Sequence, residues 1–355
     1  MNKKTNDLIF LIQSFEQPRI LKIIIDKSKI YDNIYVYGFT RKIHAVENYK
    51  ILDDYKNVSY AIVGALEDRK YWNRLHHYIK LLRIIYNNHG LRKKQLYVVG
   101  MDLRLLCVAI FNKYTEYVIS DLAWLYYKQP FKTVWGMLDK LLAKSSDKVL
   151  MTSRGFYETY YKKFVKKENL VLTENKLATY GRVFPLEKLK DDKIHIAYVG
   201  AFRYKKIISN LLNVVKGDSR LALNFYGDGF SDIVEKMKEH AETYDNITFN
   251  GAFKNPDDLQ KIYEQNNINF VVYNNEQENE RVAMPNKFYE SGFFNVPIVC
   301  ATKTYVGKRA LELNMGWVCD IDQDGIQNFF DSLNIDQIMD CHNGIKKLDK
   351  SLFNY

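Results

Sequence analysis

The sequence lacks the features that mark several simple functional classes. It has only four cysteines in 355 residues, and none stands in a CxxC or Cys/His spacing. Three of them lie in apolar runs, which predicts buried thiols in a reducing compartment and argues against a metal site. No run approaches the roughly 18–20 apolar residues that cross a bilayer. Polar residues bracket the short LIFLI stretch near the start, so we expect no signal peptide.

Motifs for nucleophilic catalysis are also missing. There is no G-x-S-x-G, and the pair His76 and His77 has no carboxylate at a matching spacing, so we expect no catalytic triad. No DxD pair stands where it would coordinate a divalent ion, and we expect no metal. The absence of internal repeats and low-complexity segments excludes a solenoid.

The charge of the chain is unevenly divided. Residues 1–190 carry 34 Lys+Arg against 18 Asp+Glu, a net of +16, and residues 191–355 carry 18 against 24, a net of −6. A shift of this size indicates a domain boundary. The basic half favours an anionic partner such as a membrane surface, although a solvated lysine-rich surface is the simpler reading. It contains no nucleic-acid recognition motif, so we expect no nucleic acid as partner.

Short apolar strands alternate with helices along the chain, which predicts doubly wound parallel sheets. In the first half we expect strands at 7–13, 34–39, 58–64, 95–100, 115–120 and 148–153, with helices at 17–29 and 69–89. In the second half we expect strands at 194–200, 221–227, 246–251, 268–273, 297–300 and 316–320. A linker is expected within 174–193. The predicted domains are 1–185, 186–325 and a helical tail at 326–355, of which 337–355 is able to cross back to the first domain.

Paired cations follow the first strand of the second half. Gly200 is followed by Arg203 and Lys206, with Lys205 as the near alternative. In a parallel sheet such a turn lies at the carboxyl edge, where ligands bind at helix N-termini. An Arg and a Lys there can neutralise a leaving nucleoside diphosphate without a metal. Ordinary surface cations are the simpler reading of these residues when they are taken alone.

The phrase MPNKFYESG predicts a second anion site. A helix is expected to begin at Pro285, with Asn286 and Lys287 in its first turn and Glu290 one turn later. Both the helix dipole and the lysine favour an anion. The ionised carboxylate of Glu290 can accept hydrogen bonds from two ribose hydroxyls.

Two further turns end strands of the same half. In FYGDGF, Gly227 ends a strand, and Asp228 is expected to cap the helix at 231–243. In NITFNG, Gly251 ends the next strand. A GDG turn alone is common and specifies no function.

The order of these phrases resembles the donor-binding half of GT-B glycosyltransferases, particularly the retaining family 4 (group 1) enzymes of bacterial cell-envelope polysaccharide assembly. The resemblance covers residues 194–320. It implies two Rossmann-like domains facing across a cleft, with a UDP-sugar or GDP-sugar donor in the second and a glycan acceptor in the first. It implies no cofactor beyond the donor, and retention through an oxocarbenium-like state assisted by the leaving phosphate.

The resemblance also assigns residues. Gly200, Arg203 and Lys206 match the pattern that holds the donor diphosphate, and Gly227 lies near the nucleotide. Glu290 corresponds to the second member of the family's paired-glutamate motif. The first member would fall at Val282, which cannot serve, and Glu278 and Glu280 are the nearby carboxylates.

Two aspartates end strands of the first half. Asp121 follows VIS, where relatives have a polar residue near the donor sugar, and Asp102 follows VVGM. Asp121 is therefore a candidate catalytic residue. A helix cap is the alternative role for both.

The segment 156–167 predicts a helix with an aromatic face. Phe156, Tyr157, Tyr160, Tyr161 and Phe164 recur at helical spacing. The flanking lysines are Lys162, Lys163, Lys166 and Lys167. This pattern is typical of a helix in a membrane interface, and a core-facing helix with a lysine-rich outer side is the alternative.

These observations together predict a cytoplasmic hexosyltransferase attached peripherally to the inner face of the membrane. We expect it to extend a lipid-linked capsule, exopolysaccharide or lipopolysaccharide glycan with retention. A glycosyltransferase with a soluble or protein acceptor and a non-catalytic nucleotide-sugar-binding protein are the alternatives.

Overall fold

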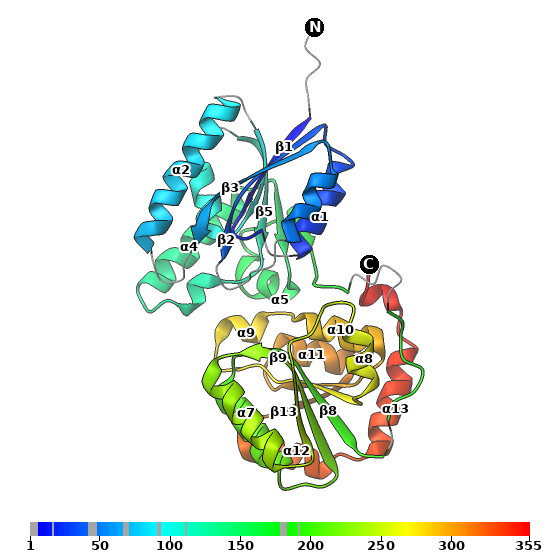
Figure 1. Ribbon diagram of the computed structural model, residues 1–355. Helices are drawn as coiled ribbons and strands as arrows, with labels where there is room; N and C mark the ends of the chain where they lie inside the picture. Colours follow the sequence, from blue (N-terminus) through cyan, green and yellow to red (C-terminus); the bar gives the residue numbers. More distant parts are fainter. Residues whose placement is uncertain are drawn as a thin grey trace. The chain divides into compact units, whose positions relative to one another are not determined.

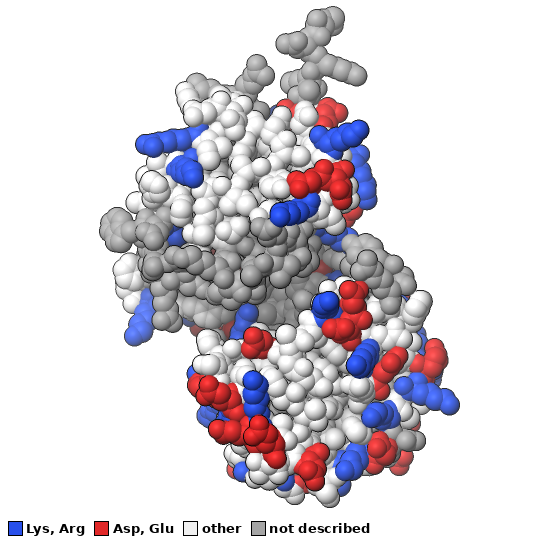
Figure 2. Space-filling view, viewed as in Figure 1, with Lys and Arg blue, Asp and Glu red and all other residues white. Residues whose placement is uncertain are grey.

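A computed structural model describes residues 6–15, 18–41, 48–66, 71–90, 94–110, 112–177, 183–190 and 192–355. The chain divides into two compact units, Met1–Thr173 (unit 1) and Glu174–Tyr355 (unit 2) (Figure 1). Unit 1 carries 30 Lys+Arg and 16 Asp+Glu, and unit 2 carries 22 and 26. Figure 2 shows the two signs intermixed on the visible face of unit 2, in keeping with this near balance.

Unit 1 is built on a parallel sheet of seven strands in the order β3-β2-β1-β4-β5-β6-β7. The strands are β1 Asp7–Ile12, β2 Asn33–Arg41, β3 Val58–Leu66, β4 Lys94–Val99, β5 Asn112–Ile119, β6 Lys148–Met151 and β7 Leu170–Leu172. The helices are α1 Pro18–Ser28, η1 Asn48–Asp54, α2 Tyr71–His89, α3 Met101–Leu106, η2 Cys107–Ala109, η3 Ala123–Tyr126, α4 Phe131–Lys144, α5 Arg154–Phe156, the π-turn η4 Tyr157–Tyr161 and η5 Lys167–Asn169. The six strands predicted for this half are confirmed. The edge strand β7 is an addition, since LVL is too short to show a period of two.

Helices cover both faces of this sheet. α1 and η1 pack on one face around Phe10 and Val36, and α2 and α3 pack on the other around Ile9 and Leu11. Figure 1 shows α1 on one side of the sheet and α2 and α4 on the other. Successive side chains of a strand point to opposite faces of the sheet, so each strand contributes residues to both layers.

Unit 2 is a parallel sheet of six strands in the order β10-β9-β8-β11-β12-β13. The strands are β8 Ile194–Phe202, β9 Leu221–Gly229, β10 Ile247–Gly251, β11 Ile268–Val271, β12 Ile298–Ala301 and β13 Gly316–Cys319. The helices are α6 Lys205–Val215, α7 Ser231–Thr243, α8 Leu259–Glu264, α9 Glu278–Val282, α10 Asn286–Phe294, α11 Tyr305–Glu312, α12 Gln323–Ser332, α13 Ile335–Lys346 and η6 Lys350–Leu352. All six strands predicted for this half are confirmed.

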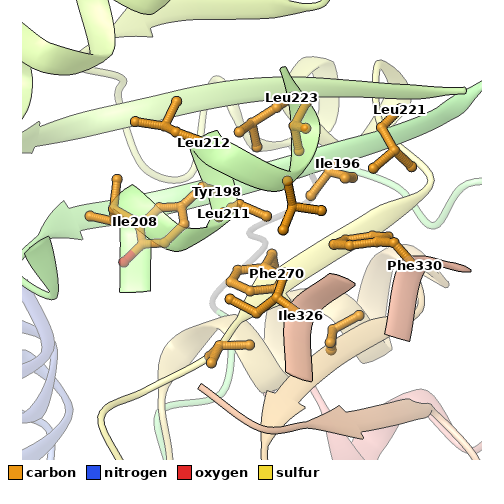
Figure 3. Packing of buried hydrophobic residues seen from close by; sticks show 14 of the residues in the cluster. Ile196, Tyr198, Ile208, Leu211, Leu212, Leu221, Leu223, Phe270, Ile326 and Phe330 are labelled. Carbon is orange, nitrogen blue, oxygen red and sulfur yellow. The ribbon is translucent and has the colours of Figure 1, made fainter. Parts of the chain in front are cut away.

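The core of unit 2 has two layers, one on each face of the sheet. Figure 3 shows the first layer, in which Tyr198 of β8, Leu211 of α6, Phe270 of β11 and Phe330 of α12 converge. The second layer joins α8, α10, α11 and α13 around Phe294. Each such side chain contributes about 1.5–3 kcal/mol by leaving water, so the sheet edge that carries the candidate site is held from both sides.

The segment after Thr173 belongs structurally to unit 2. Leu177 forms a parallel bridge with Asn354, and the Nζ of Lys176 donates to the carbonyl of Ser351 over 2.6 Å. The structural division therefore falls after Thr173, whereas the sequence places its boundary at 185/186. Part of the predicted linker, 178–182 and 191, lies outside the described residues. The described contacts of the tail at 337–355 are with unit 2 itself.

The segment 156–167 differs from its prediction. It has only a short turn of α5 and the π-turn η4, and Phe156, Tyr161 and Val165 are buried. Phe156 and Tyr161 therefore face the core, as in the alternative reading, and cannot insert into a membrane, whereas Tyr157, Tyr160 and Phe164 are partly exposed. Lys162, Lys163, Lys166 and Lys167 are exposed, so their contact with a membrane stays a prediction. Within the described residues, no helix combines the length and apolarity needed to cross a bilayer.

A buried carboxylate explains why these aromatic residues turn inward. Asp139 of α4 is 2% exposed and accepts hydrogen bonds from Tyr117 (2.5 Å), Trp124 (3.0 Å) and Tyr161. Burial raises the pKa of Asp139, and the three donors oppose that shift. The carboxylate thus ties α4, β5, η3 and η4 together.

Replacing Asp139 by Ala should destabilise unit 1 by at least about 3 kcal/mol, because three buried donors lose their acceptor. Urea unfolding followed by tryptophan fluorescence measures this change. Lys162→Ala, at an exposed site, is the control and should change the unfolding free energy by less than about 0.5 kcal/mol. A loss below about 1 kcal/mol for Asp139→Ala would mean that the network contributes little.

Candidate functional site

The site is built where β8 and β9 run side by side at the carboxyl edge of the unit 2 sheet. Gly200 pairs with Gly227, and both strands continue two residues beyond these glycines, to Phe202 and Gly229. The sequence reading, which ends each strand at its glycine, is therefore short by two residues. A Cβ on Gly227 would lie 1.9 Å from the carbonyl oxygen of Gly200, so no side chain fits there. Both glycines have positive φ, 119° and 142°, which also favours glycine.

Lys287 of α10 lies over this glycine pair. Its Cε would be 3.5 Å from a Cβ on Gly200, and its Nζ lies 5.3 Å from the ring centroid of Phe253. The same Nζ donates to both carboxylate oxygens of Glu290, at 3.0 and 2.8 Å. The structure therefore brings three predicted residues, Gly200, Lys287 and Glu290, together at one sheet edge.

Glu290 is almost completely buried. Its side chain is 2% exposed, and its Oε2 also accepts from the hydroxyl of Tyr263 over 2.8 Å. Asn269 of β11 donates to Ser291 at 2.8 Å and to the Tyr263 hydroxyl at 3.1 Å, which orients the phenol. Burial, followed by the nearby charge of Glu290, raises the pKa of Tyr263. The Glu290 carboxylate thus accepts hydrogen bonds from α8 and α10, and Asn269 of β11 orients the donor on α8.

Arg203 lies beside a group of tyrosines at the same edge. It is exposed, and its positive charge opposes the rise in pKa that burial causes in Tyr198 and Tyr273. The rings of Tyr204 and Tyr273 lie 5.3 Å apart. The negative charges of Glu290 and Glu280 add to the rise in the pKa of Tyr273. Tyr273 is therefore within the electrostatic influence of one guanidinium and two carboxylates.

Glu280 and Glu278, the two candidates for the missing first glutamate, differ in how deeply they are buried. Glu280 is 9% exposed and its charge also raises the pKa of Tyr204, which places it beside the tyrosine group. Glu278 begins α9 and is partly exposed. Val282, at the family's position, is an apolar side chain that is 9% exposed.

The two lysines that begin α6 differ in their contacts. Lys205 donates to Asp232 over 2.5 Å and lies 5.1 Å from the ring of Phe230. Lys206 is exposed next to it, with no hydrogen bond or ion pair among the described residues. The structure thus leaves Lys206 the more available of the two. Asn286, in the first turn of α10, is also exposed.

Three aspartates do not take the roles of helix caps. The α7 helix begins after Phe230, and Asp228 accepts a hydrogen bond from its neighbour Gly229 over 2.7 Å, so the predicted cap is wrong. Asp121 is exposed after β5, and the next turn begins after Leu122 without a side-chain cap. Asp102 accepts from Gln13 over 2.6 Å and from Tyr78. Asp121 and Asp102 belong to unit 1, and the catalytic role of Asp121 stays a prediction.

Sequence reasoning missed the aromatic part of the site. Tyr273, Phe253 and Tyr263 surround the charged residues, and none was singled out. A signal existed for the first two, because INFVVY and NGAF place an aromatic residue just after a strand, at the ligand-binding edge. Tyr263 lies mid-helix and gave no such signal.

Comparison with known proteins identifies the fold. No family model matches this chain. It is 24% identical over 225 residues to an uncharacterized 41.2 kDa protein in the cps region of Klebsiella pneumoniae, a match covering 59% of this chain. The chain spans little more than half, 56%, of that relative's length.

Solved structures match over nearly the whole chain. Sucrose-phosphate synthase from Thermosynechococcus elongatus has a TM-score of 0.72 at 13% identity, over 98% of this chain and 95% of that one. Anabaena HepE in complex with UDP-glucose has a TM-score of 0.67 at 12% identity, over 98% and 95%. A Listeria monocytogenes protein assigned as a UDP-N-acetylglucosamine 2-epimerase has a TM-score of 0.61 at 9% identity, over 98% and 92%. The chain therefore has the GT-B fold, as the sequence predicts.

Replacing Gly227 by Ala should destabilise unit 2 by about 3 kcal/mol, because the new Cβ collides with backbone and φ is positive. Thermal unfolding measures the change. Gly217→Ala is the matched control, since its Cβ would meet nothing closer than 3.9 Å and its φ is not positive. An unchanged melting temperature for Gly227→Ala would show that the two strands are not held at this approach.

Proposed function

We propose that this protein is a retaining glycosyltransferase that binds a nucleotide-diphosphate sugar at the carboxyl edge of the unit 2 sheet. The observation that carries the proposal is the convergence of Gly200, Arg203, Lys287 and Glu290 around two strands whose backbones approach without side chains. Structures of the same fold with UDP-glucose and of a synthase that makes a sugar phosphate support it. The fold match to a 2-epimerase makes acceptor-free epimerisation the second candidate.

In the proposed complex, the bare backbone at Gly200 and Gly227 lets the diphosphate approach the sheet edge. Arg203 and Lys206 neutralise the charge that develops as the nucleoside diphosphate leaves, which is the largest electrostatic demand of the reaction. The departing phosphate then assists the incoming acceptor hydroxyl on the same face, so the anomeric configuration is retained. No protein nucleophile takes part in this step.

In this proposal Lys287 binds either Glu290 or the donor. Without donor it holds Glu290 through both oxygens. With donor bound, its ammonium moves to the diphosphate or the sugar, and the freed carboxylate accepts hydrogen bonds from the ribose hydroxyls. Tyr263 keeps Glu290 in place during the exchange.

Glu280 is the residue we assign to the donor sugar in place of the missing first glutamate at Val282. It is buried close to Tyr204 and Tyr273, within the influence of Arg203, whereas Glu278 is partly exposed. Asp121 of unit 1 is the proposed catalytic contact from the acceptor side.

The acceptor we propose is a lipid-linked cell-envelope glycan, extended at the cytoplasmic face of the membrane. The excess of basic residues in unit 1 and the exposed lysines Lys162, Lys163, Lys166 and Lys167 support a negatively charged surface as partner. The relative in a cps region supports a role in capsule or other surface polysaccharide.

Replacing Arg203 by Ala should lower transfer about 100- to 1000-fold, the effect of losing a charge contact made in the transition state. Transfer from a radiolabelled nucleotide sugar to membrane lipid extract measures this. Lys206→Ala should be impaired likewise, and Lys205→Ala, whose ammonium is held by Asp232, is the matched control. Near-wild-type turnover of folded Arg203→Ala would remove this residue from the mechanism, and conversion of the donor sugar without any acceptor would favour the epimerase.

Replacing Glu290 by Gln should weaken binding of a nucleoside diphosphate about tenfold or more, because the amide cannot accept two ribose hydroxyls as the carboxylate does. Calorimetry with UDP and with 2′-deoxy-UDP separates this role from a structural one. A ribose contact predicts that wild type prefers UDP and that Glu290→Gln has lost the preference. An equal preference in both proteins would leave Glu290 as a structural partner of Tyr263 and Lys287.

A further inference from the structure

The helices α2 and α4 of unit 1 carry apolar side chains that do not pack into the core. α2 buries Leu81 and Ile85 in the core beside the sheet, and α4 buries Leu142 and Ala143. One apolar stripe is enough for a helix that covers a sheet. Each of these helices carries a second apolar stripe.

The second stripes are exposed to solvent. On α4, Phe131 is 63% exposed, and on the adjoining η2, Val108 is 72% exposed. The other large apolar side chains of this surface that are exposed are Leu75, Ile79 and Tyr86 of α2 and Val134, Met137 and Leu141 of α4. Figure 1 shows α2 and α4 on the same side of the sheet. Contiguous exposed apolar surface of this kind marks an interaction site.

A groove of about 1080 Å³ runs between these helices. Its walls include Leu75 and Ile79 of α2, Leu105 of α3, and Phe131 and Trp135 of α4. The groove and the two exposed stripes together are called the α2/α4 surface below. Polar residues also line the groove, among them Arg74 and Asp102, and Asp102 accepts hydrogen bonds from Gln13 and Tyr78. The apolar walls are suited to hydrocarbon.

The segment that forms the α2/α4 surface is rich in basic residues. Residues 71–144 carry 12 Lys+Arg and only four Asp+Glu, and two of the 12, Lys94 and Arg104, are buried. Of these four, Asp139 is buried, Asp102 accepts from Gln13 and Tyr78, and Glu116 accepts from Lys27. Only Asp121 is exposed. Figure 2 shows Lys and Arg but no Asp or Glu among the coloured side chains on the side of unit 1 where α2 lies.

The end of α4 lies next to a cluster of lysines. A hollow of about 290 Å³ at the end of α4 is lined by Lys144, Lys162, Lys163 and Lys166. The lysines that the sequence assigns to a membrane therefore adjoin an exposed apolar helix, although that helix is α4 and not the segment 156–167.

We propose that unit 1 docks on an anionic lipid bilayer through the α2/α4 surface, with acyl chains entering the groove and the lysines at the level of the phosphate groups. An apolar face flanked by cations is the pattern of helices that lie in a membrane interface. A soluble protein partner would be expected to present mixed charges to a groove, whereas a bilayer offers hydrocarbon beneath negative charge alone. The inference rests on the proposed function only in that a lipid-linked acceptor is found at such a surface.

Vesicle sedimentation tests the proposal on the full chain. Wild type should sediment with vesicles of phosphatidylcholine and phosphatidylglycerol at low salt, and the double variant Phe131→Asp/Val134→Asp should partition at least tenfold less. Phe184→Asp and Leu311→Asp change equally exposed apolar residues of unit 2 and are the matched controls. Wild type that stays in the supernatant, or a double variant that binds as well as wild type, overturns the proposal.

Acyl chains brominated along their length test entry into the groove. In a protein with Trp72→Phe and Trp317→Phe, vesicles of such lipid should quench the remaining fluorescence, and Trp135→Phe should remove most of the quenching. Sedimentation without quenching would mean contact with headgroups alone and would overturn the groove assignment. A wild-type dimer in solution that Phe131→Asp/Val134→Asp converts to a monomer would instead assign the surface to a second copy of the chain.

Nucleotide binding without vesicles separates this inference from the proposed function. UDP affinity and urea unfolding of unit 1 should be the same in wild type and in the double variant, which shows that the variant is folded. If wild type sediments with anionic vesicles but binds neither UDP nor GDP, the transferase proposal fails and the docking surface stands. If it binds nucleotide but no vesicle, the docking surface fails alone.

Discussion

The candidate site depends on one steric constraint, the approach of β8 to β9 at Gly200 and Gly227. A Cβ on Gly227 would lie 1.9 Å from the carbonyl oxygen of Gly200. Because glycine has no Cβ, the two strands can approach here and stay paired as far as Phe202 and Gly229. The added length places Arg203 beyond the sheet, next to Tyr273. It also leaves backbone, and no side chain, beneath Lys287. A larger residue at Gly227 would separate the strands and move the cations that follow them.

The electrostatics of the site rest on a buried ion pair. Lys287 and Glu290 are 13% and 2% exposed, so both have lost most of their hydration, and each compensates the other. Such a pair adds little stability compared with apolar residues of the same volume, but removing one partner is costly. In the proposed complex a diphosphate competes for the same ammonium, so the pair responds to ligand in a way that an apolar contact does not.

The strands of both sheets other than β7 were predictable because each is an apolar run that ends at a glycine or a polar turn. What failed was the identity of partners far apart in the chain. The spacing of Phe156 and Tyr161 shows an apolar face, but nothing local shows that Asp139, 22 residues from Tyr161, buries an acceptor beneath it. Likewise Lys205 and Lys206 are equivalent in sequence, and Asp232 distinguishes them only after folding. The residues Arg203, Lys287 and Glu290 came from motifs, whereas Tyr263 required the packing of α8 against α10.

The first and last residues of unit 2 are hydrogen-bonded to each other. The backbone N–H of Leu177 donates to the carbonyl of Phe353, and the N–H of Tyr355 donates to the carbonyl of Leu177. The Tyr355 hydroxyl donates to the carbonyl of Glu174. This arrangement affects the order of events during synthesis. Unit 1 is complete once Thr173 has left the ribosome, and domains generally fold as they emerge. The bridge between Leu177 and Asn354 joins residues 177 positions apart, so it forms only after the rest of unit 2 has been synthesised. On the ribosome, therefore, the polypeptide carries a folded basic unit 1 while unit 2 is still incomplete.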